Sequence, residues 1–202
     1  MTAPDTDFDD APDVQSAIRE ATYRALCRHG YHETTIQHIA DEFEKSKSLL
    51  YYHYENKHEL LTDFLRHLLD ELAERLTVDG ADPHDDLLTL VDRIVPVPMD
   101  DEEAQFRRVL LEIRAAAPHD EGHRELVRRS DTIIRSAFAD VIRRGIEEGR
   151  FDSGVDPDEA AEFVHTTLLG TMIRGVSLDD PETVARTRET LVTYLDRHLL
   201  AE

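Results

Sequence analysis

The three lysines of the chain, Lys45, Lys47 and Lys57, lie within thirteen residues of one another. Hydroxyl and aromatic side chains stand between them, in the run Ser46-Lys47-Ser48-Leu49-Leu50-Tyr51-Tyr52-His53-Tyr54. Ammonium groups, hydroxyls and imidazoles are donors that proteins use to bind the phosphate oxygens of nucleic acids. The other twenty basic residues are arginines, which are spread along the chain. The residue types and spacing of this segment therefore indicate phosphate binding.

The charge of the chain is distributed unevenly. The whole chain has 44 acidic against 23 basic residues, a net charge of −21, which argues against a general affinity for nucleic acid. Residues 1–13 hold five aspartates and no base, residues 14–57 hold six bases and six acids, and residues 58–202 hold 17 arginines against 33 acids. The lysine segment thus lies in a neutral part of an acidic chain, and its local charge permits DNA as a partner.

The composition also bears on the source and compartment of the protein. Few lysines and many acids are typical of extreme halophiles, so we expect a halophilic archaeon as the source; an ordinary acidic protein that favours arginine is the alternative. A single cysteine, Cys27, excludes an internal disulfide and indicates a reducing compartment. We see no signal peptide and no apolar run near the roughly 20 residues that span a bilayer. We therefore expect a cytoplasmic protein without a membrane partner.

Apolar residues recur at helical spacing throughout the chain, and strand signals are nearly absent. We therefore predict an all-α protein of about nine helices. The acidic N-terminus, residues 1–13, is expected to be disordered. The last five helices are predicted over about residues 84–95, 101–116, 121–148, 157–175 and 181–200.

Capping residues set the predicted boundaries of the N-terminal helices. The first helix ends at Gly30. The second begins at Thr34, whose hydroxyl can cap it, with Gln37 three residues later as the partner in a capping box. Ser46 can cap a short third helix, and Asn56 a fourth. The second and third helices are short, close in sequence and apolar on facing sides, which predicts a helix-turn-helix whose second helix enters a DNA major groove.

The candidate DNA contacts come from the exposed side of the third helix and from the starts of the helices before and after it. Hydroxyl and ammonium groups there can bind phosphate oxygens, and a leucine can touch a thymine methyl group. The start of the fourth helix adds free backbone N–H groups and the positive end of a helix dipole. These candidates are Thr35, Gln37, Ser46, Lys47, Ser48, Leu49, Tyr52, His53 and Lys57.

Three nearby residues have two interpretations each. Lys45 stands in the turn and can point toward the duplex or away from it. Tyr51 follows Leu50 on the inward side of the helix, which favours a core position over a DNA contact. Tyr31 either packs on the second helix or touches a phosphate.

With these elements in place, about residues 14–61 resemble the DNA-binding domain of the TetR/AcrR family of transcriptional regulators. The resemblance rests on motifs at family spacing: Gly30-Tyr31, Thr34-Thr35, Ser46-Lys47 and the closing Leu50-Tyr51-x-His53-Tyr54-x-x-Lys57. It implies an N-terminal three-helix helix-turn-helix domain over residues 14–61. Residues 62–202 would then form a C-terminal helical bundle for ligand binding and dimerisation.

The resemblance implies a ligand-responsive regulator, expected to be a repressor, that binds a palindromic double-stranded DNA operator as a homodimer and is released by a small molecule. The helices at about 157–175 and 181–200 would pair with those of a second copy. Candidate pocket residues on the C-terminal helices are Phe106, Leu110, Arg114, Phe138, His165 and Leu169. Arg114 can instead pair with an acid of a neighbouring helix, and His165 can be an ordinary core histidine.

The sequence departs from the family pattern in the turn of the helix-turn-helix. Phe43, Glu44 and Lys45 replace a small residue, a glycine and an aliphatic residue. We expect a non-glycine residue there to adopt the special backbone conformation of the turn, at a cost of about 1 kcal/mol. Ser48 and Leu49 differ from the family as well, so its base preference does not transfer to this chain.

Two other classes of protein compete with the regulator. One is an acidic helical interaction protein with a degenerate helix-turn-helix, which the turn and the net charge favour. The other is an enzyme, which the lack of a nucleophile or phosphate loop disfavours, so we expect no catalytic residues and no cofactor. His119 and His123 lie four residues apart, but without a third ligand we interpret them as solvated rather than metal-binding.

Overall fold

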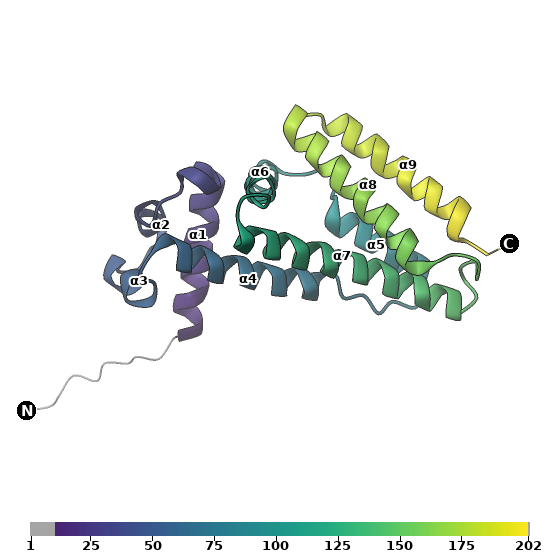
Figure 1. Cartoon of the computed structure of the whole chain (residues 1–202), viewed down its shortest axis with the longest axis horizontal. Helices are drawn as coiled ribbons and strands as arrows, with labels where there is room; N and C mark the ends of the chain where they lie inside the picture. The colour runs from purple at the N-terminus through teal and green to yellow at the C-terminus, as the bar shows by residue number, and fades with distance from the viewer. Residues whose placement is uncertain (1–10, 202) are drawn as a thin grey trace, which may run out of the picture. The chain divides into compact units, whose positions relative to one another are not determined.

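The computed structural model describes residues 11–201, with side chains from Val14 onward. Over this range the chain forms nine α-helices, and the single pair of bridged extended residues is Phe151 with Leu200 (Figure 1). The helices are α1 (Ala11–Glu33), α2 (Ile36–Glu42), α3 (Lys47–His53), α4 (Lys57–Arg75), α5 (Pro83–Ile94), α6 (Asp101–Ala116), α7 (Glu121–Glu147), α8 (Pro157–Leu178) and α9 (Pro181–Leu199). The all-α prediction with nine helices is confirmed.

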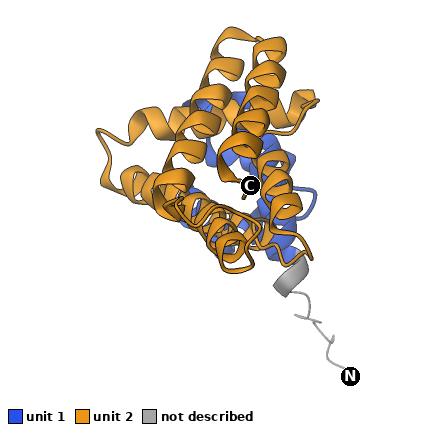
Figure 2. Ribbon diagram, turned by 90° about the vertical axis from the view of Figure 1, so that its right-hand side faces the viewer, with its two compact units in different colours: residues 1–65 blue, residues 66–202 orange. Residues whose placement is uncertain are grey.

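The chain divides into two compact units, unit 1 (residues 1–65) and unit 2 (residues 66–202), coloured separately in Figure 2. The boundary falls within α4, four residues beyond the predicted domain limit. The predicted disordered segment, residues 1–13, lies outside the described residues except for its last three, which open α1. Among the described helices, none is long and apolar enough to cross a bilayer.

Unit 1 is held together by a small core shared by α1, α2, α3 and the start of α4. Alanines at 21, 25 and 40 are fully buried and let α1 and α2 pack closely. Larger side chains fill the remainder, each contributing about 1.5–3 kcal/mol when fully buried. They are Ile18, Leu26, Ile39, Phe43, Leu50, Leu60, Leu61, Phe64 and Leu65.

The junction between α1 and α2 corrects one predicted cap. Gly30 has φ 76° and ψ 171°, which interrupts α1 where the sequence predicted its end. The cap of α2 is Thr35, whose Oγ1 accepts a hydrogen bond from His38 N at 3.1 Å. The predicted cap, Thr34, is buried and donates instead to Gly30 O at 2.5 Å. Gln37 consequently completes no capping box, because its amide binds Asp41.

The starts of α3 and α4 follow the predicted residues. Ser46 is the N-cap of α3, although its hydroxyl makes no capping hydrogen bond. Asn56 Oδ1 accepts from Glu59 N at 3.0 Å, which confirms its role before α4. The turn between α2 and α3 was expected to contain a non-glycine residue in the left-handed conformation. That expectation was wrong: within residues 11–201, Asp179 is the one non-glycine residue with positive φ.

Unit 2 contains α5 to α9 and most of α4, and an aspartate caps each helix from α5 onward. The carboxylate of each cap accepts a backbone N–H of the first turn at 2.7–3.0 Å. Proline stands directly after the cap in α5, α8 and α9, where its missing N–H costs no hydrogen bond. The capping aspartates are Asp82, Asp100, Asp120, Asp156 and Asp180.

The core of unit 2 is a continuous apolar cluster contributed mainly by α5, α7, α8 and α9. Phe138 and Ile142 of α7 lie at 0% exposure and contact this cluster. Gly145 permits the ring of Phe151 to pack against α7, because a Cβ on residue 145 would lie 2.1 Å from the ring. The sequence had placed Phe138 in a candidate pocket, whereas it belongs to the packed core.

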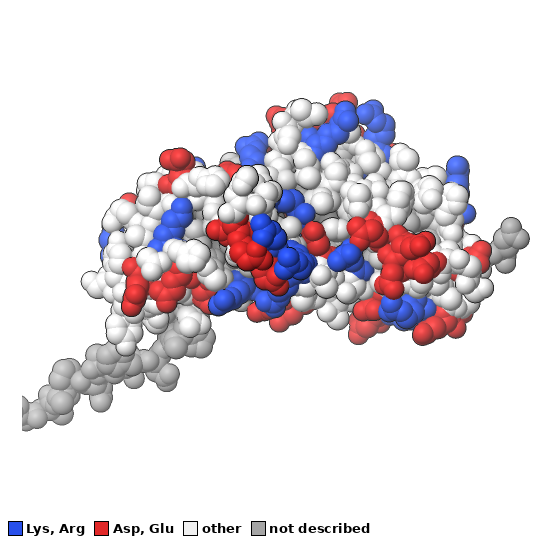
Figure 3. All heavy atoms as spheres, in the orientation of Figure 1, with Lys and Arg blue, Asp and Glu red and all other residues white. Residues whose placement is uncertain are grey.

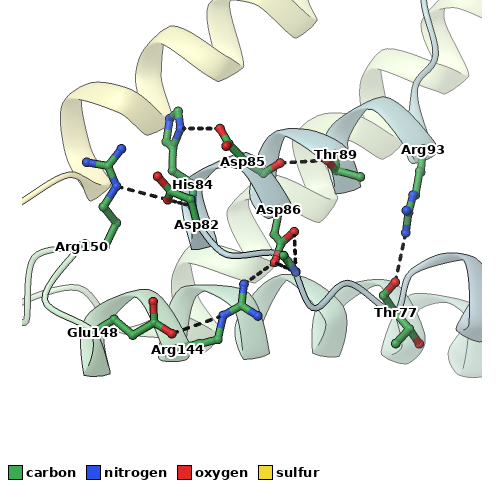
Figure 4. A network of polar contacts seen from close by, with 11 residues as sticks. Thr77, Asp82, His84, Asp85, Asp86, Thr89, Arg93, Arg144, Glu148 and Arg150 are labelled. Carbon is green, nitrogen blue, oxygen red and sulfur yellow. Dashed lines mark hydrogen bonds and ion pairs between the residues drawn. The ribbon is translucent and has the colours of Figure 1, made fainter.

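A polar network ties the start of α5 to α7 (Figure 4). The buried carboxylate of Asp86 accepts the backbone N–H of Gly80 at 3.0 and 3.3 Å and pairs with Arg144 of α7. A Cβ on residue 80 would lie 2.4 Å from Asp86 Oδ1, so a larger residue there would displace this carboxylate from its hydrogen bonds. Next to it, His84 Nε2 lies 2.7 Å from Asp196 Oδ1 of α9. The network thereby fixes α5 against two other helices of unit 2.

Candidate nucleic-acid interface

Helix α3 presents most of the predicted DNA contacts to solvent. Leu50 is fully buried and anchors the helix in the core of unit 1. Ser46, Lys47 and Ser48 are exposed at its start, and Leu49 is half-buried beside them. Because one side of a two-turn helix is anchored, the opposite side is fixed in orientation and can enter a groove.

Two tyrosines extend the exposed side of α3. Tyr52 is 83% exposed and its ring meets His53 edge-on at 5.5 Å between centroids. Tyr51 was expected in the core, but it is 46% exposed. Successive residues of an α-helix are rotated by about 100° about its axis. Tyr51 follows the buried Leu50, so its side chain lies at the margin of the core. This exposure favours the second of the two interpretations of Tyr51, a candidate DNA contact.

The end of α3 is fixed to α4 by a contact that the sequence did not predict. Tyr54 OH donates to Asp63 Oδ2 at 2.5 Å. Burial, together with this hydrogen bond, raises the pKa of Tyr54 well above its ordinary value. The phenol thus stays protonated as a donor, and it holds the end of α3 on α4.

Lys47 and the start of α2 are linked through an acid that the sequence analysis did not single out. Lys47 Nζ pairs with Asp41 Oδ1, and Gln37 Nε2 donates to the same oxygen at 2.9 Å. The hydrogen bond from Lys47, reinforced by that from Gln37, lowers the pKa of Asp41. Two candidate contacts therefore converge on one carboxylate. Asp41 lies one helical turn after Gln37, and from this spacing the sequence could have predicted their contact.

Lys57 is held at the junction between α1 and α2. Its Nζ donates to the backbone oxygens of Tyr31 and His32 at 3.0 and 3.2 Å, and it lies 5.5 Å from the centre of the Tyr31 ring. Tyr31 therefore packs against Lys57. These contacts fix the start of α4 to this junction.

The surface of unit 1 carries both signs of charge, joined in ion pairs. Arg24 donates to Glu20 at 2.6 Å and to the backbone oxygen of Glu42 at 2.8 Å, and Arg28 pairs with the Glu42 carboxylate. On the face of the molecule that Figure 3 presents, lysines and arginines stand among acidic side chains and form no broad blue area. A DNA contact on this face would therefore depend on the placement of individual donors.

In unit 2, the candidate pocket residues have different environments. Arg114 of α6 pairs with Asp131 of α7, which is the alternative that the sequence offered for Arg114, an acid of a neighbouring helix. His165 Nε2 of α8 lies 3.4 Å from the same carboxylate. Burial raises the pKa of Asp131, but the contacts with His165 and Arg114 outweigh it and lower that pKa to about 2. Phe106 and Leu169 are half-buried, whereas Leu110 is 37% exposed.

The histidine pair considered for a metal lies around the start of α7. His123 Nδ1 lies 2.8 Å from Oδ1 of Asp120, the cap of α7, and His119 is exposed. Within the described part of the chain, no three His, Cys, Asp or Glu side chains gather to hold a metal ion.

Comparisons with known proteins cover both units. A family model described as "Bacterial regulatory proteins, tetR family" matches residues 18–63, and one described as "BetI-type transcriptional repressor, C-terminal" matches residues 83–200. A curated relative, the HTH-type transcriptional repressor AcnR of Corynebacterium diphtheriae, is 22% identical over 169 residues, 84% of either chain.

Solved structures show the same arrangement over nearly the whole length. A TetR transcription regulator from Haloarcula marismortui is 36% identical, with a TM-score of 0.83 over 93% of this chain and 99% of that one. A transcriptional regulator from Saccharomonospora viridis, solved in complex with choline, is 23% identical, with a TM-score of 0.79 over 95% and 100% of the two chains.

Proposed function

The chain belongs to the TetR family of DNA-binding transcriptional regulators, and we propose that it is a repressor that binds a palindromic operator as a homodimer and is released by a small molecule. The observation that carries the proposal is the exposed side of α3. There, Ser46, Lys47, Ser48 and Tyr52 face solvent while Leu50 anchors the helix.

The DNA contacts would come from three consecutive helix starts in unit 1. The side chains of α3 would enter the major groove, with Lys47 and Tyr52 on phosphates at either end and Leu49 near base edges. Thr35 at the start of α2 and the N–H groups at the start of α4 would hold the adjacent backbone. A complete helix-turn-helix with an anchored second helix favours this function over that of an acidic interaction protein.

The homodimer would form through α8 and α9. Phe163 and Ile173 of α8 and Tyr194 of α9 are exposed large apolar side chains, and the rings of Phe163 and Tyr194 lie 5.1 Å apart. Gly170 lies between Phe163 and Ile173 on α8, and a Cβ on residue 170 would meet no atom within 4 Å. An apolar strip with a small residue at its middle suits a second helix pair, which would complete a four-helix bundle.

The effector would bind in unit 2, where Arg114, Asp131 and His165 bring polar groups from α6, α7 and α8 together. A relative of the same fold has been solved with choline, which supports a small-molecule effector without identifying it here. An effector that prefers one conformation of unit 2 would change the spacing of the two DNA-binding units and so lower operator affinity.

Loss of DNA binding on replacement of α3 side chains tests the proposal. The duplex is the sequence upstream of the gene that encodes this chain, and affinity is measured by fluorescence anisotropy. We expect Lys47→Ala with Tyr52→Ala to weaken binding at least about 100-fold, because two phosphate contacts are lost. Arg128→Ala, an exposed change of equal charge in unit 2, is the matched control and should bind like the wild type. Unchanged affinity of the double variant would remove α3 from the interface.

A further inference from the structure

Asp41 places a carboxylate inside the surface that is proposed to meet DNA. It stands in the last turn of α2, and its Oδ1 receives both Lys47 Nζ and Gln37 Nε2. The side chains of Asp41 and Lys47 are 55% and 53% exposed, so the ion pair faces solvent. Both partners of this carboxylate are candidate DNA contacts.

The neighbouring acid, Glu42, shows what a structural carboxylate in α2 looks like. Its side chain is 12% exposed and pairs with Arg24 and Arg28, which ties α2 to α1. Asp41 makes no such contact with α1 among the described interactions, and α2 is capped by other residues, Thr35 and Phe43. The packing of unit 1 therefore does not require Asp41.

A carboxylate close to a phosphate-binding lysine acts against DNA binding. It repels phosphate oxygens, and it competes with them for the lysine ammonium. When a phosphate takes Lys47 Nζ from Asp41, one ion pair is exchanged for another, and the carboxylate is left facing the duplex. The pair of Asp41 and Lys47 is neutral, so it releases fewer counterions from DNA than a free lysine would.

We propose that Asp41 is a positioning residue that competes with phosphate for Lys47 and thereby lowers the affinity of the protein for DNA. This inference rests on the proposed function, because it requires α3 to meet DNA. Asp41 acts on DNA through Lys47 and through its own charge. In an acidic chain in which residues 14–57 are neutral overall, one such acid changes the net charge of the segment that is proposed to meet DNA.

Four variants test this proposal: Asp41→Asn, Lys47→Ala, the two combined, and Glu20→Gln. The last removes the same charge from another exposed ion pair of unit 1, with Arg24, and is the matched control. Equilibrium binding is measured by fluorescence anisotropy at a series of salt concentrations. The probes are the duplex upstream of the gene and a random-sequence duplex of equal length. Thermal unfolding of each variant confirms that it folds.

Release of Lys47 should strengthen binding. We expect Asp41→Asn to raise the affinity for both duplexes about two- to fivefold at low salt. The slope of log K against log salt should become more negative by up to about 0.9, because the net positive charge that faces the phosphates rises by one. A purely structural role for Asp41 would not change this slope. Glu20→Gln should leave the slope as in the wild type.

The combined variant separates competition for Lys47 from simple charge removal. If Asp41 holds Lys47, the gain from Asp41→Asn becomes smaller in the Lys47→Ala background, where no ion pair remains to be broken. An equal gain in both backgrounds, or an equal effect of Glu20→Gln, overturns the proposal. Weaker binding of Asp41→Asn also overturns it, since Asp41 would then hold Lys47 toward phosphate. If the wild type binds neither duplex, the proposed function itself fails, which is a different result.

Discussion

Units 1 and 2 cap their helices with different residues. In unit 1, neutral side chains stand at the starts of α2, α3 and α4, namely Thr35, Ser46 and Asn56. In unit 2, five aspartates stand at the starts of α5 to α9. Either kind of cap satisfies backbone N–H groups. A neutral cap additionally leaves the positive end of the helix dipole available to a phosphate, whereas an aspartate neutralises it.

The difference teaches how an acidic protein can bind DNA. Residues 66–202 hold 31 acids against 17 bases, and an aspartate caps each of α5 to α9, whereas the residues that stand before α2, α3 and α4 in unit 1 are uncharged. Several acids of unit 1 are paired within the unit, as Glu42 is with Arg24 and Arg28. The interface then depends on local placement of donors rather than on a basic surface.

The largest effect on the free energy of unfolding is expected from the removal of Asp86, a buried carboxylate of unit 2. Asp86→Ala removes the partner of Arg144 and of the Gly80 N–H, and should lower the free energy of unfolding by about 3 kcal/mol or more. Chemical denaturation measures this change. Asp85→Ala, at the exposed neighbouring position, should change stability by about 0.5 kcal/mol or less. Similar losses for the two variants would contradict the structural role of the network.

A charged cap in unit 1 should separate stability from DNA binding. Thr35→Asp keeps an acceptor for His38 N, so the midpoint of thermal unfolding should stay the same or rise slightly. DNA affinity should fall about tenfold, because a negative charge is added at a helix start that faces phosphate. Thr35→Ser is the neutral control and should retain affinity. Undiminished affinity of Thr35→Asp would show that the start of α2 lies away from DNA.

The smallest effect is expected for Asp131 and depends on pH. Its folded-state pKa of about 2 lies below the ordinary value of 3.8, so its ionised form stabilises the fold above about pH 4. This contribution is lost as the pH falls toward 2. Because Asp131 is partly exposed and screened by solvent, we expect Asp131→Asn to cost about 1 kcal/mol at neutral pH. Urea unfolding should show a smaller difference at about pH 3, and a difference independent of pH would contradict this assignment.

The helices and most of their starts could be predicted from the sequence. Asn56 caps the helix that it was expected to open, and α8 and α9 begin at the predicted residues 157 and 181, because a capping residue and its partner are close in sequence. Thr34 and Thr35 are equally good caps on local grounds. Burial of Thr34 between α1 and α2, where it binds Gly30 O, decides between them, and that requires tertiary structure.

In the candidate site, too, local sequence patterns predicted some features, and others depend on tertiary contacts. The exposed position of Ser46, Lys47, Ser48 and Tyr52 follows from the burial of Leu50, which helical periodicity indicated. The partners of the lysines did not follow. Lys57 binds carbonyl groups 25 and 26 residues earlier in the chain, which no local pattern encodes. Tyr51 was assigned to the core because periodicity is poorly defined over two turns.

A footprint of the wild-type protein on the DNA upstream of its gene tests the central claim most directly. Hydroxyl-radical cleavage reports which backbone positions are protected. We expect two protected half-sites related by a two-fold axis, with their centres about one helical turn or somewhat more apart, because a homodimer would place one α3 in each. Absence of protection, or one protected site without its symmetric partner, would contradict the account.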